Sequence, residues 1–382
     1  MKVGIFTYGI YGERMTGIAR YAVELTRAMR RLDPALDIIL LNPYGEAAHP
    51  WYREFPSYPL PHLQKLPLVA TLGNLELHRA ATRLHLDILH DPCGIAPFIA
   101  PRGSYRRITT IHDALPAIYP DTQSLLTRLV FSLLVARAGR TSDAILTVSE
   151  TSADDLARHY HLPRAKIHVT PNGVSPPLIL PPGRVREILA RHSFVTPYFL
   201  YVGALSPRKN LRRVIEAFTK LRSVHPEVAL VIVGPPAWGA NDVLRDVLNS
   251  AGGNGGVTFT GFLADEDLQV VYRGAHALVF PSLYEGFGLP ALEAMSHGTP
   301  VITSNAGSLP EVVGDAALQV DPTSVEAIYQ GMLRLHGDER LRIELSQKGL
   351  FRSQSFTWQA TAVKTLRVYQ SLVDQDSWAV FG

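Results

Sequence analysis

Two glutamates, Glu285 and Glu293, flank the expected start of a helix in the segment 285–293, EGFGLPALE. Pro290 suits the first helical turn, because the N–H that proline lacks has no partner there. The amides just before the helix would then be unpaired and able to bind a phosphate. These amides belong to Phe287, Gly288 and Leu289. Because carboxylates accept hydrogen bonds from hydroxyl groups, the segment predicts a ligand with an anionic part and a polyol part, such as a nucleotide sugar. The alternative is that both glutamates only complement the helix dipole or face solvent.

A pair of cations, Arg208 and Lys209, lies in the loop 203–210 between an expected strand and an expected helix. A helix N-terminus normally favours acidic residues. Two cations there are explained if they share a bound anion with the helix amides. Arginine can donate two parallel hydrogen bonds to an anion, and lysine places a compact positive charge beside it. The alternative is a basic pair on the surface.

Three loops in the first half of the chain carry further candidates. Gly17 follows Gly9 and Gly12, but the spacing is not that of a dinucleotide-binding loop, so a phosphate contact and an ordinary turn both stay open. His112 follows an expected strand and could donate to a substrate hydroxyl or move a proton, unless it is a core or capping histidine. Asn172 lies at the expected domain junction, where it could contact a ligand or only form a turn.

Other patterns argue against a metal site. The acidic run 265–267 is similar to the D-x-D motif of metal-dependent sugar transferases, but it opens a helix, and N-capping explains it better. His78, His85 and His90 do not form a compact ligand set. We therefore expect no metal.

The composition is that of a globular protein. A chain of 382 residues with 46% hydrophobic and 19% charged residues predicts two domains. A net charge of +3 gives no reason to expect nucleic-acid binding. Cys93 is the single cysteine, which excludes an intrachain disulfide and fits the cytoplasm. The nearly apolar run 125–138 is too short to span a bilayer and no targeting segment is visible, so we expect a cytoplasmic protein with at most peripheral membrane contact.

Short apolar strands alternate with helices in both halves, which predicts two parallel sheets covered on both faces. The expected strands are Val3–Thr7, Asp37–Leu41, Ile88–His90, Arg107–Ile111, Ala144–Val148 and Ile167–Thr170, then Tyr198–Val202, Val228–Val233, Val257–Thr260, Ala277–Phe280, Val301–Thr303 and Ala317–Val320. The expected helices are Ile18–Arg31, Ser124–Ala138 and Thr151–His159, then Asn210–Arg222, Asn241–Ser250, Asp265–Arg273, Pro290–Ser296 and Ser324–His336.

Residues 172–197 are rich in proline and glycine, which predicts a linker. We expect an N-terminal domain at 1–183 and a C-terminal domain at 184–355. A final helix at about 356–382 is expected to return to the first domain. Ligands would lie between the two Rossmann-like domains, at the carboxyl ends of the strands.

Together these loops resemble the retaining glycosyltransferases of family 4, which have the GT-B fold. The most specific matches are VGALSPRKNL at 202–211, PSLYEGFGLP at 281–290, EAM at 293–295, GTPV at 298–301 and GSLPEV at 307–312. The first half matches more loosely, through Gly17, the His112-Asp113 pair, VSE at 148–150 and PNGV at 171–174. The chain is most similar to bacterial mannosyl- and glucosyltransferases of surface polysaccharide synthesis.

The resemblance implies a role for each candidate. Arg208 and Lys209 would hold the donor diphosphate, Glu285 would contact the sugar hydroxyls, and Glu293 the ribose. The remaining implied contacts are Gly261 and Phe262 beside the base, Gly17 at the phosphates, and His112 at the transferred sugar. It also implies that the N-terminal domain binds the acceptor, and that the donor, GDP-mannose or UDP-glucose, binds to the C-terminal domain without a metal or other cofactor.

The resemblance implies a glycan or lipid-linked acceptor, and the oligomeric state stays open. The apolar and basic segments 63–86 and 125–140 could lie on an anionic bilayer or pack on the N-terminal sheet. A non-catalytic relative that binds nucleotide sugars or glycans as an assembly partner is the second hypothesis. If the site is purely functional, Glu285→Ala and Lys209→Ala should abolish transfer while the melting temperature stays nearly unchanged.

Overall fold

The computed structural model describes residues 1–379 apart from 13–14, 72, 97, 99–102, 120–124, 193 and 236–254. The chain forms two compact units, of which the first comprises Met1–Gly173 and Thr357–Gly382 and the second comprises Val174–Phe356. The division falls at Gly173, ten residues before the expected boundary. The helix expected at 241–250 lies outside the described residues.

The first unit is built on a seven-stranded parallel sheet with the order β3-β2-β1-β4-β5-β6-β7. Its strands are β1 (Lys2–Phe6), β2 (Asp37–Asn42), β3 (Ser57–Pro59), β4 (Ile88–Asp91), β5 (Arg106–Thr110), β6 (Ala144–Thr147) and β7 (Ile167–Val169). All were expected except β3, a three-residue edge strand. The strand order reverses between β1 and β4, which is where such folds place their ligand loops.

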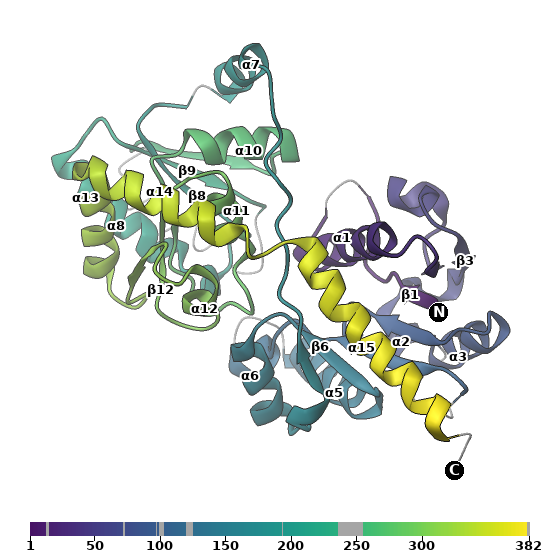
Figure 1. Cartoon of the computed structure of the whole chain (residues 1–382). Helices are drawn as coiled ribbons and strands as arrows, with labels where there is room; N and C mark the ends of the chain where they lie inside the picture. The colour runs from purple at the N-terminus through teal and green to yellow at the C-terminus, as the bar shows by residue number, and fades with distance from the viewer. Residues whose placement is uncertain are drawn as a thin grey trace. The chain divides into compact units, whose positions relative to one another are not determined.

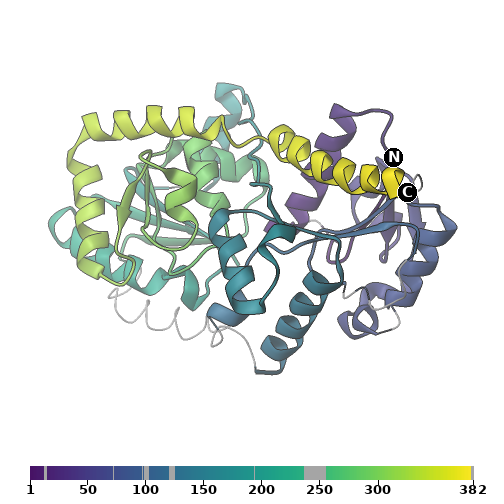
Figure 2. The same cartoon turned by 60° about the horizontal axis from the view of Figure 1, so that its bottom comes forward.

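Helices cover both faces of this sheet, as Figure 2 shows. One face packs on α1 (Gly17–Leu32) and α15 (Trp358–Ala379), through a core that includes Tyr21, Trp358 and Tyr369. Figure 1 shows α15 beside α1, so the final helix belongs to the first unit although its sequence follows the second. The remaining helices are α2 (Leu66–Ala70), α3 (Gly73–Arg83), α4 (Leu115–Ile118), α5 (Leu125–Thr141) and α6 (Glu150–Tyr160).

A chain of buried hydrogen bonds ties α15 to the sheet. The Tyr369 hydroxyl lies 2.6 Å from Nδ1 of His90, and Nε2 of His90 lies 2.7 Å from the Thr110 hydroxyl. The Thr110 hydroxyl also lies 3.1 Å from the hydroxyl of Tyr21 on α1. Burial lowers the pKa of His90 to about 3, so this imidazole is neutral at physiological pH. These contacts fix α1, α15 and the centre of the sheet as one body.

The second unit has a six-stranded parallel sheet with the order β10-β9-β8-β11-β12-β13. Its strands are β8 (Tyr198–Val202), β9 (Ala229–Val233), β10 (Val257–Gly261), β11 (Ala277–Phe280), β12 (Val301–Ser304) and β13 (Leu318–Val320). One face packs on α8 (Leu211–Val224) and α13 (Val325–Gly337). The other helices are α7 (Pro182–His192), α10 (Asp265–Gly274), α11 (Leu289–Ser296), α12 (Leu309–Val313) and α14 (Glu339–Ser353).

The predicted linker at 172–197 is wrong for its central part, because residues 182–192 form α7. The proline and glycine that indicated a break, Pro182 and Gly183, are the first residues of this helix. Proline is tolerated there because the first helical N–H groups have no intrahelical partner. Across the described part of the chain, no helix is both long and apolar enough to cross a membrane.

Candidate functional site

The centre of the second unit's sheet brings two loops together. β8 and β11 are neighbours at the point where the strand order reverses. The loop after β8 contains Arg208 and Lys209, and the loop after β11 contains Glu285. Since parallel strands end at the same edge of a sheet, this arrangement builds a site from segments about 75 residues apart in sequence.

The two cations lie in the loop before α8, as expected, and this loop forms a 3-10 turn, η6 (Pro207–Lys209). Asn210 separates η6 from α8 and has a left-handed backbone with φ of 62°. Its side-chain nitrogen donates to the carbonyls of Pro281 at 2.9 Å and Pro322 at 2.6 Å. Asn210 is buried and therefore fixes the cation loop against the ends of β11 and β13, a positioning role that the sequence did not reveal.

Arg208, Lys209 and Glu285 form one group, here named the ion cluster, in which Glu285 is buried and the two cations are partly buried. Oε1 of Glu285 lies 2.9 Å from Nη1 of Arg208 and 2.9 Å from Nζ of Lys209. The ammonium of Lys209 also lies 4.7 Å from the ring centre of Phe280. Burial alone would raise the pKa of Glu285, but Lys209 and Arg208 outweigh it and hold this pKa at about 2. Glu285 is therefore ionised at physiological pH and lies against two cations.

The backbone of Glu285 is held by the loop between β12 and α12. The Ser308 hydroxyl donates to the carbonyl of Glu285 at 2.8 Å, and the Ser308 amide donates to it at 3.3 Å. Gly307 has a φ of 61°, and a Cβ atom there would lie 3.1 Å from both the nitrogen and the oxygen of Glu285. Glycine is therefore needed at 307 for both conformation and space.

Helix α11 begins directly after this loop. Gly288 is its N-cap residue, has a φ of 102° and makes no side-chain capping bond, while Pro290 lies in the first turn as predicted. Pro290 has no N–H, and the amides of Ala291 and Leu292 donate to the carbonyl of Gly288 at 3.0 and 3.3 Å, so the amide of Leu289 is the one in this turn that could bind an anion. Phe287 is buried and packs edge-on against Phe356, with ring centres 5.8 Å apart.

Glu293 lies on α11, where a neighbouring tyrosine orients it. The Tyr272 hydroxyl donates to Oε2 of Glu293 at 2.9 Å. The Tyr272 ring stacks on His297, whose Nδ1 lies 2.7 Å from the Glu293 carbonyl oxygen. The carboxylate is half-buried, so it is pre-oriented and still accessible. The sequence around Glu293 did not predict the contact with Tyr272, which lies 21 residues earlier in the chain.

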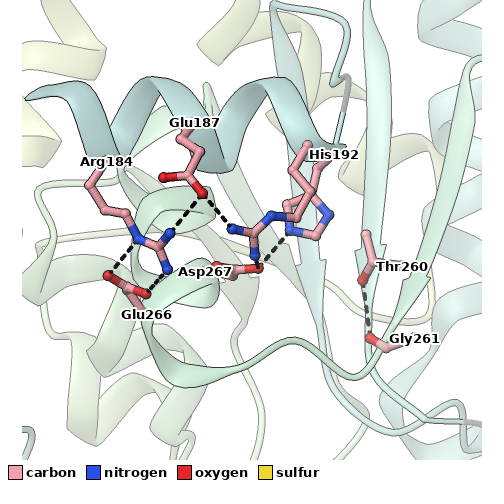
Figure 3. Close-up of polar contacts among 8 residues, drawn as sticks. Arg184, Glu187, His192, Thr260, Gly261, Glu266 and Asp267 are labelled. Atoms are coloured by element: carbon pink, nitrogen blue, oxygen red, sulfur yellow. Dashed lines mark hydrogen bonds and ion pairs between the residues drawn. The ribbon is translucent and has the colours of Figure 1, made fainter.

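The proposed base-flanking residues lie at the end of β10. Gly261 has a φ of 69°, and the space where its Cβ would be is open, while Phe262 is 44% exposed. The carbonyl of Gly261 accepts from the Thr260 hydroxyl at 3.0 Å, seen in Figure 3, and from the Gly234 amide at 2.9 Å. The backbone is thus fixed, whereas the Phe262 side chain projects from it.

The acidic run 265–267 does not cap α10 as predicted, because its N-cap residue is Ala264. Figure 3 shows that two of these carboxylates face α7. Glu266 pairs with Arg184 at 2.6 Å, and Asp267 pairs with His192 at 2.8 Å. The run therefore attaches α7 to α10.

The first unit contains the other candidates. Gly17 is the exposed first residue of α1, behind Thr16, whose hydroxyl accepts from the Ala19 amide at 3.2 Å. Asn172 is 4% exposed, and its side-chain oxygen has no hydrogen-bond partner among the described residues. Neither observation tests a contact with a donor, so both roles stay predictions.

His112 follows β5 in the first unit. Its Nε2 donates to the carbonyl of Pro92 at 2.9 Å. The imidazole ring lies perpendicular to the ring of Tyr21, with ring centres 4.9 Å apart. Burial lowers the pKa of His112, so the ring is neutral at physiological pH. The buried Asp91 accepts from the amides of Ile95 and Ala96 at 2.7 and 2.6 Å and so holds the loop that His112 contacts.

Aromatic side chains gather at the same edge of this sheet. Tyr8 and Tyr44 follow β1 and β2, and Tyr11 packs on Tyr44 with ring centres 4.9 Å apart. The Tyr11 side chain is 61% exposed. The Cys93 thiol donates to the carbonyl of Tyr8 at 3.1 Å, which joins this loop to the one that His112 contacts. We call Tyr8, Tyr11 and Tyr44 the tyrosine group.

Comparison with known proteins matches both halves of the chain. Residues 15–177 match the family described as Glycosyltransferase Family 4, and residues 191–350 match Glycosyl transferases group 1. O-antigen chain mannosyltransferase B from Escherichia coli is 32% identical over 94% of this chain and 97% of its own length. An MMP alpha-(1->4)-mannosyltransferase from Mycolicibacterium hassiacum is 33% identical over 62% of this chain and 56% of its own length.

Solved structures share the architecture. Sucrose-phosphate synthase from Thermosynechococcus elongatus superposes with a TM-score of 0.80, at 19% identity, over 98% of this chain and 99% of its own. Anabaena HepE in complex with UDP and glucose gives a TM-score of 0.76, at 18% identity, over 97% of this chain and 100% of its own. At these identities the likeness shows the fold alone, which is GT-B.

The buried ion cluster changes one expectation from the sequence. Removal of the Glu285 carboxylate leaves two cations close together and mostly shielded from water, which costs stability. We therefore expect Glu285→Ala to lower the melting temperature as well as activity, so a loss of stability no longer separates a structural role from a functional one.

The low pKa of Glu285 predicts an acid-sensitive contribution to stability. Since its pKa is lowered from 4.5 to about 2, the contribution is complete above about pH 4.5 and is lost as the pH falls toward 2. Glu285→Gln cannot show this loss. Urea denaturation at pH 7 and pH 3 should show a fall in wild-type stability that exceeds the variant's by on the order of 1–3 kcal/mol.

The matched control is Glu216→Gln, which removes an exposed carboxylate paired with Arg212 on the surface of α8. Surface pairs contribute little, so this variant should keep the wild-type pH dependence. Identical pH dependence in wild type and Glu285→Gln would contradict the buried pairing.

Proposed function

The chain belongs to the family 4 glycosyltransferases, and from this premise we propose that it transfers mannose from a nucleotide-diphosphate sugar to a glycan or lipid-linked acceptor in polysaccharide synthesis. Mannose is favoured over glucose because two of its similar relatives are named mannosyltransferases. We further propose that the transfer retains the anomeric configuration and needs no metal. The observation that carries the proposal is the ion cluster, in which Glu285 holds Arg208 and Lys209 together at the carboxyl edge of the sheet.

Charge development explains how such a cluster would accelerate transfer. Cleavage of the anomeric C–O bond leaves negative charge on the departing diphosphate. Arg208 and Lys209 are already fixed by Glu285, and the Leu289 amide at the start of α11 follows in the same loop. Cations held in place stabilise the charged transition state more than the ground state, because they need no reorganisation. They would supply the charge that a divalent ion supplies in other transferases.

The low pKa of Glu285 bears on the proton transfer. A carboxylate with a pKa of about 2 is a weak base and does not suit the removal of a proton from an acceptor hydroxyl. We therefore assign Glu285 to positioning the sugar and the cations. The departing phosphate oxygen would take the acceptor proton, with attack on the same face of the sugar, as retention requires.

The tyrosine group supports a glycan acceptor. Sugar rings have apolar faces that pack on aromatic rings, and Tyr11 presents an exposed ring at the sheet edge where the loop of His112 lies. Exposed Leu129 and Leu133 on α5, near Arg137, are compatible with a lipid surface. Peripheral membrane contact and the cytoplasmic location stay predictions.

The function is tested by incubation with a panel of donors that includes GDP-mannose and UDP-glucose. We expect one nucleotide diphosphate to raise the melting temperature, since a ligand that binds the folded state stabilises it. The matching donor should release its nucleotide at the same initial rate with and without EDTA. Failure to bind or cleave any donor would contradict the proposal, and tight binding without turnover on any acceptor would favour the non-catalytic alternative.

Lys209→Met tests the role of the cations. The substitution keeps most of the side-chain volume and removes one charge, so we expect kcat to fall by roughly 10²–10³ while the acceptor KM stays the same. Lys220→Met is the matched control, because Lys220 lies exposed on α8 and pairs with Glu326 on the surface. Equal rates for the two variants would show that Lys209 is not part of the catalytic machinery.

Tyr11→Ala tests the acceptor contact. Loss of a stacked ring should raise the acceptor KM by roughly 3–10-fold while kcat and the donor KM stay unchanged. Tyr11→Phe retains the ring and should behave like the wild type. An unchanged acceptor KM in Tyr11→Ala, measured on the glycan that supports turnover, would exclude the tyrosine group from acceptor binding.

A further inference from the structure

A second group of polar side chains lies at the opposite end of the second unit's sheet, before β9 begins. His225 is the C-cap residue of α8, Glu227 follows it in the turn, and His336 lies in the last turn of α13. The imidazoles lie with ring centres 4.3 Å apart. We call these three residues the 225–227–336 cluster. It shares no residue with the candidate functional site.

The spacing within the cluster is that of ligands on one ion. Oε1 of Glu227 lies 3.5 Å from Nδ1 of His225 and 3.3 Å from Nε2 of His336, and one ligand atom from each residue falls within 4.8 Å of the others. Two ligands on a tetrahedral Zn²⁺, each about 2.0–2.1 Å from it, are roughly 3.3–3.4 Å apart. N–H···O hydrogen bonds are usually shorter, at about 2.7–3.2 Å.

The electrostatic surroundings also favour a cation. The C-terminal ends of α8 and α13 meet at the cluster, and each helix dipole places partial negative charge there. Glu227 adds a full negative charge. Arg342 opposes this, since its guanidinium donates to the carbonyls of Leu335 at 2.7 Å and His336 at 3.0 Å. It binds backbone oxygens and leaves the facing side chains of the three residues to one another.

We propose that the 225–227–336 cluster binds Zn²⁺ and so joins the ends of α8 and α13. Two imidazoles and one carboxylate form a typical zinc ligand set, and a water molecule would complete the tetrahedron. Mg²⁺ and Ca²⁺ prefer oxygen ligands and do not fit it. The Glu227 side chain is 53% exposed, which gives the ion a route from solvent. The site is separate from the candidate functional site, because it lies at the opposite edge of the sheet from the ion cluster.

The test uses the full chain without a polyhistidine tag, stripped of metal by a chelator. Isothermal titration with Zn²⁺ should show one site per chain, and Zn²⁺ should raise the melting temperature while Mg²⁺ does not. His225→Ala and Glu227→Gln should each weaken Zn²⁺ binding by at least about tenfold and remove most of the rise in melting temperature. Both side chains are partly or fully exposed, so the variants are expected to fold.

The control is His159→Ala, which removes an exposed histidine from the last turn of α6 in the first unit and should leave Zn²⁺ binding unchanged. Absence of stoichiometric binding, or equal binding by wild type and both cluster variants, would overturn the proposal. The proposal does not rest on the proposed transfer reaction. A stripped chain that transfers sugar normally but melts earlier than the zinc-loaded chain supports both.

Discussion

The structure of the second unit depends on the burial of two cations with one carboxylate. Removal of Arg208, Lys209 and Glu285 from water is costly, and their mutual attraction repays it only if the geometry is well fixed. Asn210 fixes the cation loop by binding the ends of two strands, and Ser308 fixes the carboxylate by binding its backbone. The geometry holds two cations on one carboxylate oxygen at the carboxyl edge of the sheet, where we propose that an anionic ligand binds. This is why the same residues serve stability and, as we propose, catalysis.

The two edges of the sheet in the second unit have different roles. The carboxyl edge has loops that contain glycines with positive φ, such as Gly288 and Gly307, and Gly307 allows the backbone of Glu285 to approach closely. The opposite edge has helix ends and short turns, which need only be held together. A zinc ion at the 225–227–336 cluster would hold the helix ends together without affecting the chemistry at the carboxyl edge. Stability and activity could then be altered independently within one unit.

The sequence predicted most of the fold because each buried parallel strand is a short apolar run, as in Tyr198–Val202 and Ala277–Phe280. The prediction failed where a residue type is common in two different kinds of local structure. Pro182 and Gly183 indicate a linker and also suit the start of α7, and contacts distant in sequence, such as those of Arg184 with Glu266 and His192 with Asp267, favour the helix. The sequence also placed Arg208, Lys209 and Glu285 in one site, because strand ends share an edge. It could not reveal Asn210, Tyr272 or Ser308 as positioning residues, since each acts on a partner distant in sequence.

The central claim is that the ion cluster receives a diphosphate. A crystal structure of the chain with its bound nucleoside diphosphate tests it most directly. The account predicts phosphate oxygens within hydrogen-bonding distance of both Arg208 and Lys209, with Glu285 still in contact with the two cations. A diphosphate bound elsewhere, with the ion cluster unchanged and without a phosphate contact, would contradict it.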